Sequence, residues 1–595
     1  MKNKSYSSKH STESLISLAV FIIAFIGLAI VPLLVRVTPV ANYLNTYSWY
    51  NSDAVRFDSY SLIKSNVILF LGVASLVTLF IRQYLYKTYS LKDPIIISSL
   101  LLLALILLSQ FFSSIPSISN SGMIDRFESS WVWISYILIF ICVYGENWSD
   151  KALLKIKYAF LASTAILGII GVFQYLGLDP VFNSLTKPFI TSFKMNGIDY
   201  NADYSINYKV IVQTLYHYNY VGFYLSLSIP FILTFILHEK NRVMQLSMVL
   251  LLALSVFNLL GSSARGGLVG VIASIPFFIY FNRHILIKNK KIVFVLCLVF
   301  VIIFTAFEAS TNGFITSRLK NIFTSVETQN KLSSIEIVDN QIKFQLSTGE
   351  LLINVLSDTN TDWTSEFYFN SEPTALTLDS ANNYYVFDDE KLNGVNLFLT
   401  QYDTLTMLTI NAYGEKWNFA YDGTKELKYV NAFGKFDTIT KPDTLGFEGR
   451  EKLGSSRGYI WSRTLPLILE KPLLGYGPDT FAVIFPQQDY VGKYNAYNTT
   501  NMIVDKSHNM YLQIPMNSGI PSLVVYIGLT ILVLYKGYLF NRSNPISAWN
   551  TAIVLSVISY SVAAFFNDSS VQLSSVFWIL LALSASISKF NVLKK

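Results

Sequence analysis

The stretch SSRGYIWSRTLPLILEKPLLGYGPDTF (residues 455–481) lies between two very apolar parts of the chain, yet it carries several charged side chains. Trp461 follows Arg457 by four residues and Leu465 follows it by eight, so these side chains share one face of a predicted helix. Pro472 ends this helix, because the residue before a proline is disfavoured in the α conformation. An arginine at the start of a helix is thus predicted beside the apolar bulk of the chain.

The sequence that follows adds a turn and a titratable group. Gly475 and Gly477 flank Tyr476 and permit a sharp turn, whose N–H groups we expect to point outward. Further along, DKSHNMYLQIPMNSG (residues 505–519) contains one histidine, His508, at the start of a second apolar helix. A cation, a turn and a titratable base at the boundary of an apolar region together predict a site.

The composition is that of a polytopic membrane protein. Of the 595 residues 52% are hydrophobic and only 14% are charged, whereas about a quarter are charged in a soluble protein. Aromatic residues reach 15%, a density that suits two membrane–water interfaces, and the net charge is +7. The two cysteines, Cys142 and Cys297, lie in apolar runs and provide neither a disulfide framework nor a metal quartet.

Twelve apolar segments are each near, or slightly short of, the ~20 residues that a helix needs to cross a bilayer. The first segment follows Lys2, Lys4 and Lys9 and lacks a cleavage site, so we expect an uncleaved signal anchor. The segments are 15–35, 66–85, 94–112, 131–144, 158–176, 220–237, 245–260, 267–280, 292–307, 521–539, 548–566 and 573–587.

The distribution of Lys and Arg predicts the orientation of these segments. With the N-terminus inside, most Lys and Arg of the connecting segments fall on the inner side, as the positive-inside rule requires. Both termini are then cytoplasmic. The loop 179–217, Arg265 and everything from about residue 308 to residue 520 are then extracytoplasmic.

Between residues 333 and 438 the hydrophobic period changes to two, as in QIKFQL and LTMLTINAY, with turn signals such as Asp422-Gly423. We therefore expect an all-α polytopic membrane protein, with about twelve transmembrane helices, that carries an inserted extracytoplasmic all-β domain, antiparallel and sandwich-like. The predicted parts are a membrane domain with spans one to nine (1–308), an emergent helix (Phe314–Phe323) and linker (309–332), the β domain (333–438), an outer loop with the site (439–520) and a membrane domain with spans ten to twelve (521–595).

Three outward-facing positions are candidates for chemistry: Arg265 in SSARGG, Arg457 and His508. The two glycines after Arg265 are expected to allow close backbone approach to a ligand. A charge this close to hydrocarbon is costly and tends to serve a ligand or partner. The planar fork of arginine matches a phosphate. Simpler roles remain open. Arg265 could snorkel to the interface and Arg457 could pair with a nearby glutamate, while His508 and His217 could be interfacial residues without a chemical role.

Missing motifs exclude several chemistries. The sequence has no GxxxxGK[ST], GxSxG or HExxH, which argues against a nucleotide-driven motor, a hydrolase with a nucleophile elbow and a zincin. Asp53 and Asp58 in the first outer loop form a close pair of the kind that a metal-dependent sugar transferase could use. Solvated loop charge is the simpler interpretation of this pair.

Four blocks together resemble the O-antigen ligase/polymerase superfamily (the Wzy/WaaL type), membrane glycosyltransferases with a GT-C-like fold that act on lipid-linked glycans. The blocks are YHYNYVGFYLSLSIP (216–230), SSARGG (262–267), the stretch 455–481 and SHNMYLQIPMNSGIPSLVVY (507–526). The last two blocks together are specific, and the β domain lies outside the resemblance. One departure is Asn517-Ser518-Gly519, where an acidic residue commonly precedes the glycine, so we assign no role to Asn517.

The resemblance implies roles for the candidates. Arg265 and Arg457 are expected to hold the diphosphate of the donor, and His508 to act as the base. Supporting roles are expected for His217, Asn219, Trp461, Gly475, Gly477 and Asn509. Neither a metal nor a cofactor is expected, because two guanidiniums can stabilise the departing diphosphate. Displacement at the anomeric carbon would invert its configuration.

The sequence thus predicts a glycosyltransferase at the outer face of a bacterial cytoplasmic membrane. It would polymerise or ligate glycans carried on undecaprenyl diphosphate, for O-antigen, capsule or cell-wall polysaccharide. Expected partners are the lipid-linked donor, a glycan or lipid-glycan acceptor, the bilayer and polysaccharide-assembly proteins, and no nucleic acid. The Lys/Asn/Ile/Tyr-rich composition suggests low genomic GC and favours a polymerase over a ligase. The alternative is a transporter or flippase of lipid-linked sugars, although charges at mid-bilayer would then be expected.

Overall fold

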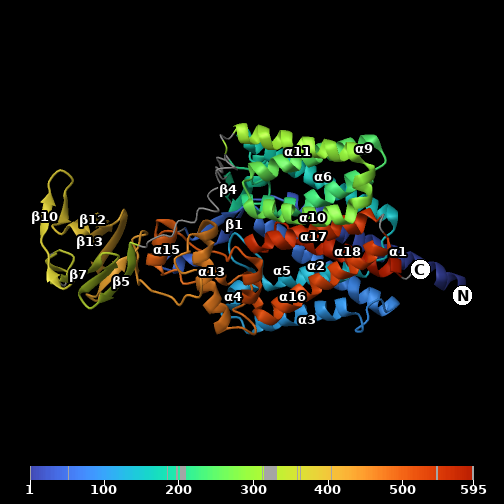
Figure 1. The fold of residues 1–595 in the computed structure, drawn as a ribbon. Helices are drawn as coiled ribbons and strands as arrows, with labels where there is room; N and C mark the ends of the chain where they lie inside the picture. Colours follow the sequence, from blue (N-terminus) through green and yellow to red (C-terminus); the bar gives the residue numbers. More distant parts are fainter. Residues whose placement is uncertain are drawn as a thin grey trace.

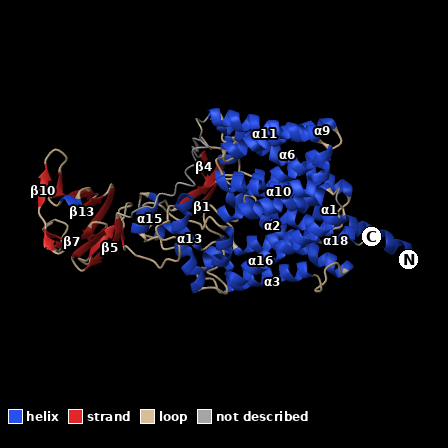
Figure 2. Ribbon diagram, viewed as in Figure 1, coloured by secondary structure: helices blue, strands red, loops and turns tan. Residues whose placement is uncertain are grey.

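The computed structural model describes residues 2–50, 53–183, 185–195, 198–201, 210–310, 313, 331–357, 359–361, 363–403, 405–544 and 547–592. In this part of the chain, helices lie side by side in one body, and most of the strands form a separate body at one end (Figures 1 and 2). The predicted emergent helix Phe314–Phe323 lies outside the described residues.

Nine helices of the described residues are long and apolar enough to cross a membrane. They are Thr12–Leu33, which extends α1 (Lys2–Phe25), α2 (Ser61–Tyr86), α3 (Pro94–Phe111), α6 (Asp150–Tyr175), α8 (Tyr218–His238), α9 (Arg242–Gly261), α10 (Arg265–Lys288), α16 (Met510–Ser543) and Ala548–Phe566, which contains α17 (Ala548–Ala563). Shorter apolar helices are α5 (Ser130–Tyr144), Val293–Ala306 within α11 (Lys290–Ser310) and Ser574–Phe590 within α18 (Ser574–Val592). A helix therefore covers each predicted apolar segment, and nine have the length and hydropathy of a span.

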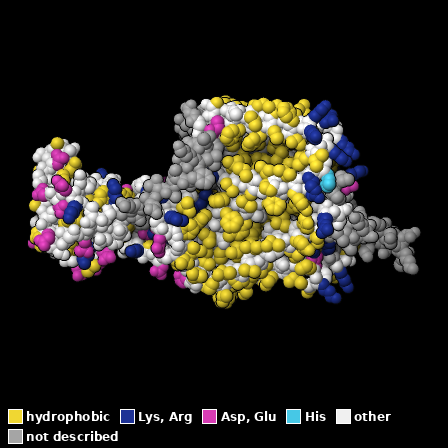
Figure 3. Space-filling model, in the orientation of Figure 1, with side chains coloured by type: hydrophobic (Ala, Val, Ile, Leu, Met, Phe, Trp, Pro, Cys, Tyr) yellow, Lys and Arg dark blue, Asp and Glu magenta, His cyan; other side chains and the backbone are white. Residues whose placement is uncertain are grey.

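The surface of the helical body is a broad belt of hydrophobic side chains (Figure 3). Lys and Arg side chains gather at the end of the belt where both termini lie, and the strands stand at the opposite end (Figures 1 and 3). An apolar belt bordered by charge is the surface that a multi-pass membrane protein presents to lipid and to the two interfaces.

Helix α8 lies inside the body, and 94% of the residues in its most apolar stretch are buried. It is apolar on every side, as expected of a helix surrounded by other helices. It packs against both α10 and α17, and Phe223 of α8 stacks on Tyr560 of α17 with ring centroids 4.1 Å apart. This packing brings the first residues of α8 and α10 next to the end of α17.

The larger strand region consists of two antiparallel sheets, each a simple meander. One sheet contains β5 (Leu332–Val338), β6 (Gln341–Leu346), β7 (Gly349–Val355), β8 (Ser365–Phe369) and β9 (Glu372–Pro373). The other contains β10 (Leu376–Asp379), β11 (Tyr384–Phe387), β12 (Val395–Tyr402), β13 (Leu405–Ala412), β14 (Glu415–Tyr421), β15 (Leu427–Val430) and β16 (Phe436–Asp437). Alternate residues of both sheets form one hydrophobic core, so the antiparallel β region expected from the period of two is confirmed.

This core is completed by residues from outside the strands. Tyr490 and Val491 of α15 (Tyr490–Tyr497) belong to it. The Nζ atom of Lys435 also donates a hydrogen bond to the carbonyl of Tyr50, at 3.0 Å, in the loop between the short strands β1 (Thr38–Ala41) and β2 (Val55–Asp58). The alternation of the strands suggests an independent fold, but the structure joins the β region firmly to the polar loops beneath it.

Candidate active site

His508 lies immediately before the residue that caps α16. The side-chain oxygen of Asn509 accepts a hydrogen bond from the N–H of Tyr511 at 2.9 Å and so caps the helix. His508 has a φ of +52°, in the left-handed region that is uncommon for residues other than glycine. Such conformations persist where the surroundings impose them, and they cluster at functional sites. The helix cap and this backbone conformation together fix where the imidazole lies.

Asp568 is the closest charged partner of His508, although sequence reasoning did not identify it. The Nδ1 atom of His508 lies 3.4 Å from Oδ2 of Asp568, and the hydroxyl of Ser507 donates to Oδ1 at 3.2 Å. Only 1% of Asp568 is exposed. Burial raises the pKa of Asp568, but the hydrogen bond and charge of His508, helped by Arg126 and Lys506, outweigh it and hold that pKa below its ordinary value. Asp568 therefore stays ionised beside the imidazole.

Arg457 faces the same segment from α13 (Leu453–Glu470). The three residues before it have positive φ values, so the regular helix begins at Arg457 itself. Its Nη2 atom donates to the carbonyl of Phe566 at 3.0 Å, and its guanidinium lies 5.8 Å from the centre of the Phe566 ring. No ion pair joins Arg457 to a carboxylate of the described residues. Burial lowers the pKa of Arg457, the charge of Asp568 opposes this, and the like charge of Arg265 adds to it.

Arg265 is the first residue of α10 and is half-buried. A Cβ atom at Gly266 would lie 2.8 Å from Phe566 Cβ, and one at Gly267 would lie 2.3 Å from the carbonyl oxygen of Gly222 in α8. We expected these glycines to allow a ligand to approach; instead they allow α10 to pack closely against α8 and the end of α17. Arg265 and Arg457 thus both border the segment that carries Phe566 and Asp568.

A cavity of about 260 Å³ opens beside Arg457 and His508. Its lining includes two residues expected to support the site, His217 and Asn219. The Nδ1 atom of His217 accepts a hydrogen bond from the N–H of Asn219 at 3.2 Å and so caps α8. Burial lowers the pKa of His217 to about 3, with the charges of Lys506 and His508 adding to the effect, so this imidazole is neutral at physiological pH.

The remaining candidates hold the site from outside the cavity. The indole N–H of Trp461 donates to the carbonyl of Ser507 at 2.9 Å, which joins α13 to the loop of His508. Lys506, which sequence reasoning also missed, lies 3.3 Å from Asp505 and 5.5 Å from the ring centre of Tyr220 in α8. Its position directly before the Ser-His-Asn element is the sequence signal that could have identified Lys506.

Gly475 and Gly477 lie in a turn that packs on α16. The N–H of Tyr476 donates to the carbonyl of Met516 at 2.8 Å, and the N–H of Gly477 donates to that of Asn517 at 3.0 Å. These N–H groups therefore bind another helix and do not point outward, which corrects the expectation from the sequence. The turn instead supports α16 at a bend.

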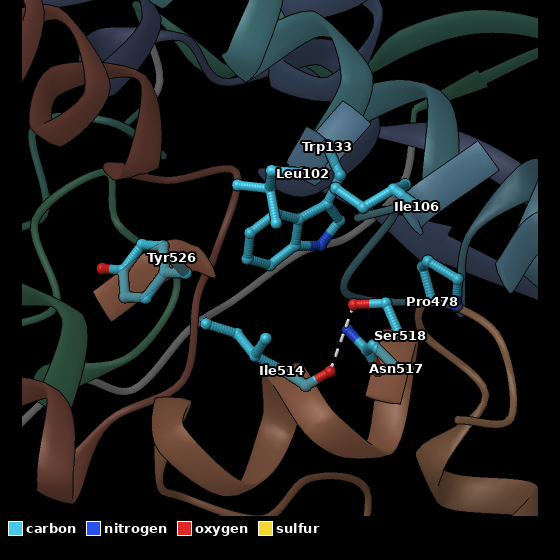
Figure 4. Close-up of a pocket in the computed structure, with 8 residues that line it drawn as sticks. All are labelled: Leu102, Ile106, Trp133, Pro478, Ile514, Asn517, Ser518 and Tyr526. Atoms are coloured by element: carbon cyan, nitrogen blue, oxygen red, sulfur yellow. Dashed lines mark hydrogen bonds between the residues drawn. The ribbon is translucent and has the colours of Figure 1, made fainter. Parts of the chain in front are cut away.

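The bend of α16 lies at Ser518 and Gly519, whose φ values are −140° and +82°. Figure 4 shows Asn517 and Ser518 facing Trp133 of α5 across a small cavity, with the hydroxyl of Ser518 bonded to the carbonyl of Ile514 at 3.2 Å. The cavity holds about 10 Å³, room for one water at most. It is therefore a packing defect at the bend and is too small for a substrate.

The variant Gly477→Ala should reduce the stability of the protein by roughly 1–3 kcal/mol, because overpacking at a fixed backbone costs this much. Gly477 has a φ of +105°, and a Cβ atom there would lie 2.1 Å from Oγ of Ser113. The matched control is Gly528→Ala in α16, where a Cβ atom meets nothing within 4 Å. Thermal unfolding in detergent should show a lower Tm only for the first variant. Equal Tm values would show that the turn is not tightly packed.

Asp58, one of the two carboxylates considered as a metal pair, has a structural role. Among the described residues no group of three or more His, Cys, Asp or Glu is arranged to hold a metal ion. Asp58 accepts hydrogen bonds from the N–H groups of Ser61 and Leu62, at 2.9 and 2.8 Å, so it caps α2. Helix capping therefore explains the position of Asp58, which the sequence analysis considered as one of two possible metal ligands.

Residues 395–527 match the O-antigen ligase family. The match supports membership in the O-antigen ligase/polymerase superfamily. No curated protein sequence matches the chain. The matched segment contains Arg457, Trp461 and His508. It begins at β12, so the last five strands are part of it, contrary to our expectation that the β region lies outside the resemblance. Arg265 and Asp568 lie outside it, and their place in the site rests on geometry alone.

Proposed function

We propose that the protein is a glycosyltransferase of the cytoplasmic membrane that transfers glycan from undecaprenyl diphosphate to a glycan or lipid-glycan acceptor. Superfamily membership supports a ligase- or polymerase-type activity on lipid-linked glycans. The observation that carries the finer proposal is the convergence of three elements on Phe566–Asp568. Arg457 binds Phe566, Gly266 beside Arg265 packs against it, and His508 pairs with Asp568.

In this proposal the two arginines bind the diphosphate of the donor. Arg457 is half-buried and has no carboxylate at ion-pair distance among the described residues, so a bound diphosphate would supply the counter-charge that its guanidinium lacks. Negative charge grows on the diphosphate as its bond to the anomeric carbon breaks. Two fixed guanidiniums stabilise this charge without reorganisation, and no metal is required.

His508 then serves as the base. Its Nδ1 atom faces the carboxylate of Asp568, so Nδ1 carries the proton and Nε2 keeps its lone pair. Nε2 takes the proton of the acceptor hydroxyl, whose oxygen attacks the anomeric carbon opposite the diphosphate. The bond to the diphosphate breaks with its electron pair, the configuration inverts, and Asp568 stabilises the imidazolium.

The direct test is reconstitution of the purified protein in liposomes with a labelled undecaprenyl-diphosphate oligosaccharide. We expect longer lipid-linked glycans if the protein is a polymerase, which we favour for a capsule or wall polymer, and glycan on a second acceptor if it is a ligase. Chelators should not reduce the rate. Movement of the labelled lipid between leaflets without any new glycosidic bond would replace this proposal by a transporter.

We further propose that the strand end of the molecule is extracytoplasmic and both termini are cytoplasmic. In a Cys142→Ala/Cys297→Ala background, a cysteine at the exposed Asn501 should react with an impermeant maleimide added to intact cells. A cysteine at the exposed Lys288, near the other end of the helices, should react only after permeabilisation. The reverse pattern would invert the topology and remove the site from the outer face.

A further inference from the structure

A second cavity, of about 910 Å³, lies at the end of the helical body near both termini. It is formed where α3 begins and where α5, α16 and α18 end. Helix α16 starts beside His508 and runs for 34 residues before it ends at this cavity, up to about 50 Å away at 1.5 Å per residue. The cavity is therefore distinct from the candidate active site.

Four charged side chains line this cavity: Asp93, Lys536, Arg542 and Lys589. The Asp93 carboxylate is fully used, since it caps α3 through the N–H of Ile95 at 3.1 Å and accepts the hydroxyl of Tyr144. Lys589 lies 3.7 Å from the same carboxylate and neutralises it. Neither Lys536 nor Arg542 has an ion-pair partner among the described residues. Two uncompensated positive charges therefore face the cavity.

Helix dipoles account for only part of this arrangement. Arg542 and Lys589 lie in the last turns of α16 and α18, where a cation is favourable without any ligand. Lys536 lies seven residues before the end of α16, about two turns inside the helix, where the dipole contributes little. The helix dipole therefore does not account for a lysine at position 536 beside the cavity.

We propose that this cavity binds a phosphate-bearing anion, with Arg542 supplying a planar fork and Lys536 a point charge. A phospholipid headgroup is the source that the surroundings favour, because Leu539 and Phe540 also line the cavity. The helices that form it end on the side of the molecule where Lys and Arg border the apolar belt (Figures 1 and 3). Basic pockets between membrane helices bind such headgroups. A soluble phosphate would use the same two side chains.

The test compares the full-length protein with Lys536→Gln/Arg542→Gln after incubation in vesicles of equal phosphatidylglycerol and phosphatidylcholine. Native mass spectrometry then counts the lipids that remain bound. We expect the wild type to retain phosphatidylglycerol preferentially, and the variant to lose roughly 30-fold in that preference, as two surface cations predict. The control is Lys288→Gln/Lys290→Gln, which removes two exposed lysines at the same end and should keep the preference.

A second experiment distinguishes a phospholipid headgroup from a soluble phosphate as the ligand of the cavity. In nanodiscs of pure phosphatidylcholine, inorganic phosphate should raise the Tm of the wild type and not that of Lys536→Gln/Arg542→Gln if the ligand is soluble. The charge-keeping variant Lys536→Arg/Arg542→Lys guards against misfolding, because it retains both positive charges and should keep most of the ligand preference that the Gln variant loses. Equal retention of both lipids by all variants, together with no effect of phosphate, would overturn the proposal.

Discussion

The variant His508→Ala is expected to bind the donor lipid as the wild type does and to lose transfer by roughly 10²- to 10⁴-fold, the usual contribution of a general base. Binding persists because the arginines and the apolar helices, which hold the donor in our proposal, are unchanged. Transfer fails because the group that takes the acceptor proton is gone: of the other lining side chains, His217 already uses Nδ1 to cap α8, and the carboxylate of Asp505 pairs with Lys506 at 3.3 Å. Single-turnover product formation and donor retention on the same preparation separate the two effects.

The matched control for this variant is His284→Ala, an exposed histidine near the far end of α10. It should leave both transfer and binding unchanged. A loss of donor binding in His508→Ala, equal to its loss of transfer, would mean that His508 holds the diphosphate and is not a base.

Asp568 should act through His508, so Asp568→Asn tests the pair in a different way. The amide keeps the size of the side chain but cannot stabilise an imidazolium, and we expect a smaller loss than for His508→Ala. Because Asp568 acts only through the imidazole, Asp568→Asn should cost little further in a His508→Ala background. A full additional loss in that background would limit Asp568 to a structural role.

The helices were predictable from the sequence, because an apolar segment of about 20 residues has few alternatives to a membrane helix. The residues at which the helices begin and end were less predictable. Helix α16 begins at Met510, close to the helix start predicted at His508, but it continues through residue 521, where we expected the span to begin. Ser518 and Gly519 bend the helix there without ending it. The sequence does not show which helices surround α8, so the burial of α8 on every side was not predictable.

The site was predictable only in its local parts. Arg457, Trp461 and His508 lie in recognisable blocks, and the structure brings Arg457 and His508 to one cavity. Asp568 lies 60 residues from His508, and a side-chain pair that forms between two helix ends leaves no periodic trace in the chain. The glycines were misread for a related reason, because a residue without a side chain is equally suited to a ligand and to a neighbouring helix.

Replacement of Arg457 by lysine should cost roughly 2–4 kcal/mol in transition-state stabilisation, or about 30- to 900-fold in kcat/KM. Lysine keeps the charge but loses the planar fork that binds two phosphate oxygens at once. It would also release Phe566, whose carbonyl Arg457 binds at 3.0 Å, close to Asp568. The control is Arg283→Lys, an exposed arginine near the far end of α10, which should show wild-type kinetics.

Arg265→Lys should lose activity to a comparable extent if both arginines bind one diphosphate, and the double variant shows whether they do. Groups that stabilise the same charge are coupled, so their losses should sum to more than the loss of the double variant. The electrostatic effect of Arg265 on Arg457 in the free protein points the same way, because a diphosphate bound between the two guanidiniums would relieve their repulsion. Strictly additive losses in this cycle would place the two arginines at separate steps, with Arg265 serving the packing of α10 against α17 and Arg457 alone holding the donor.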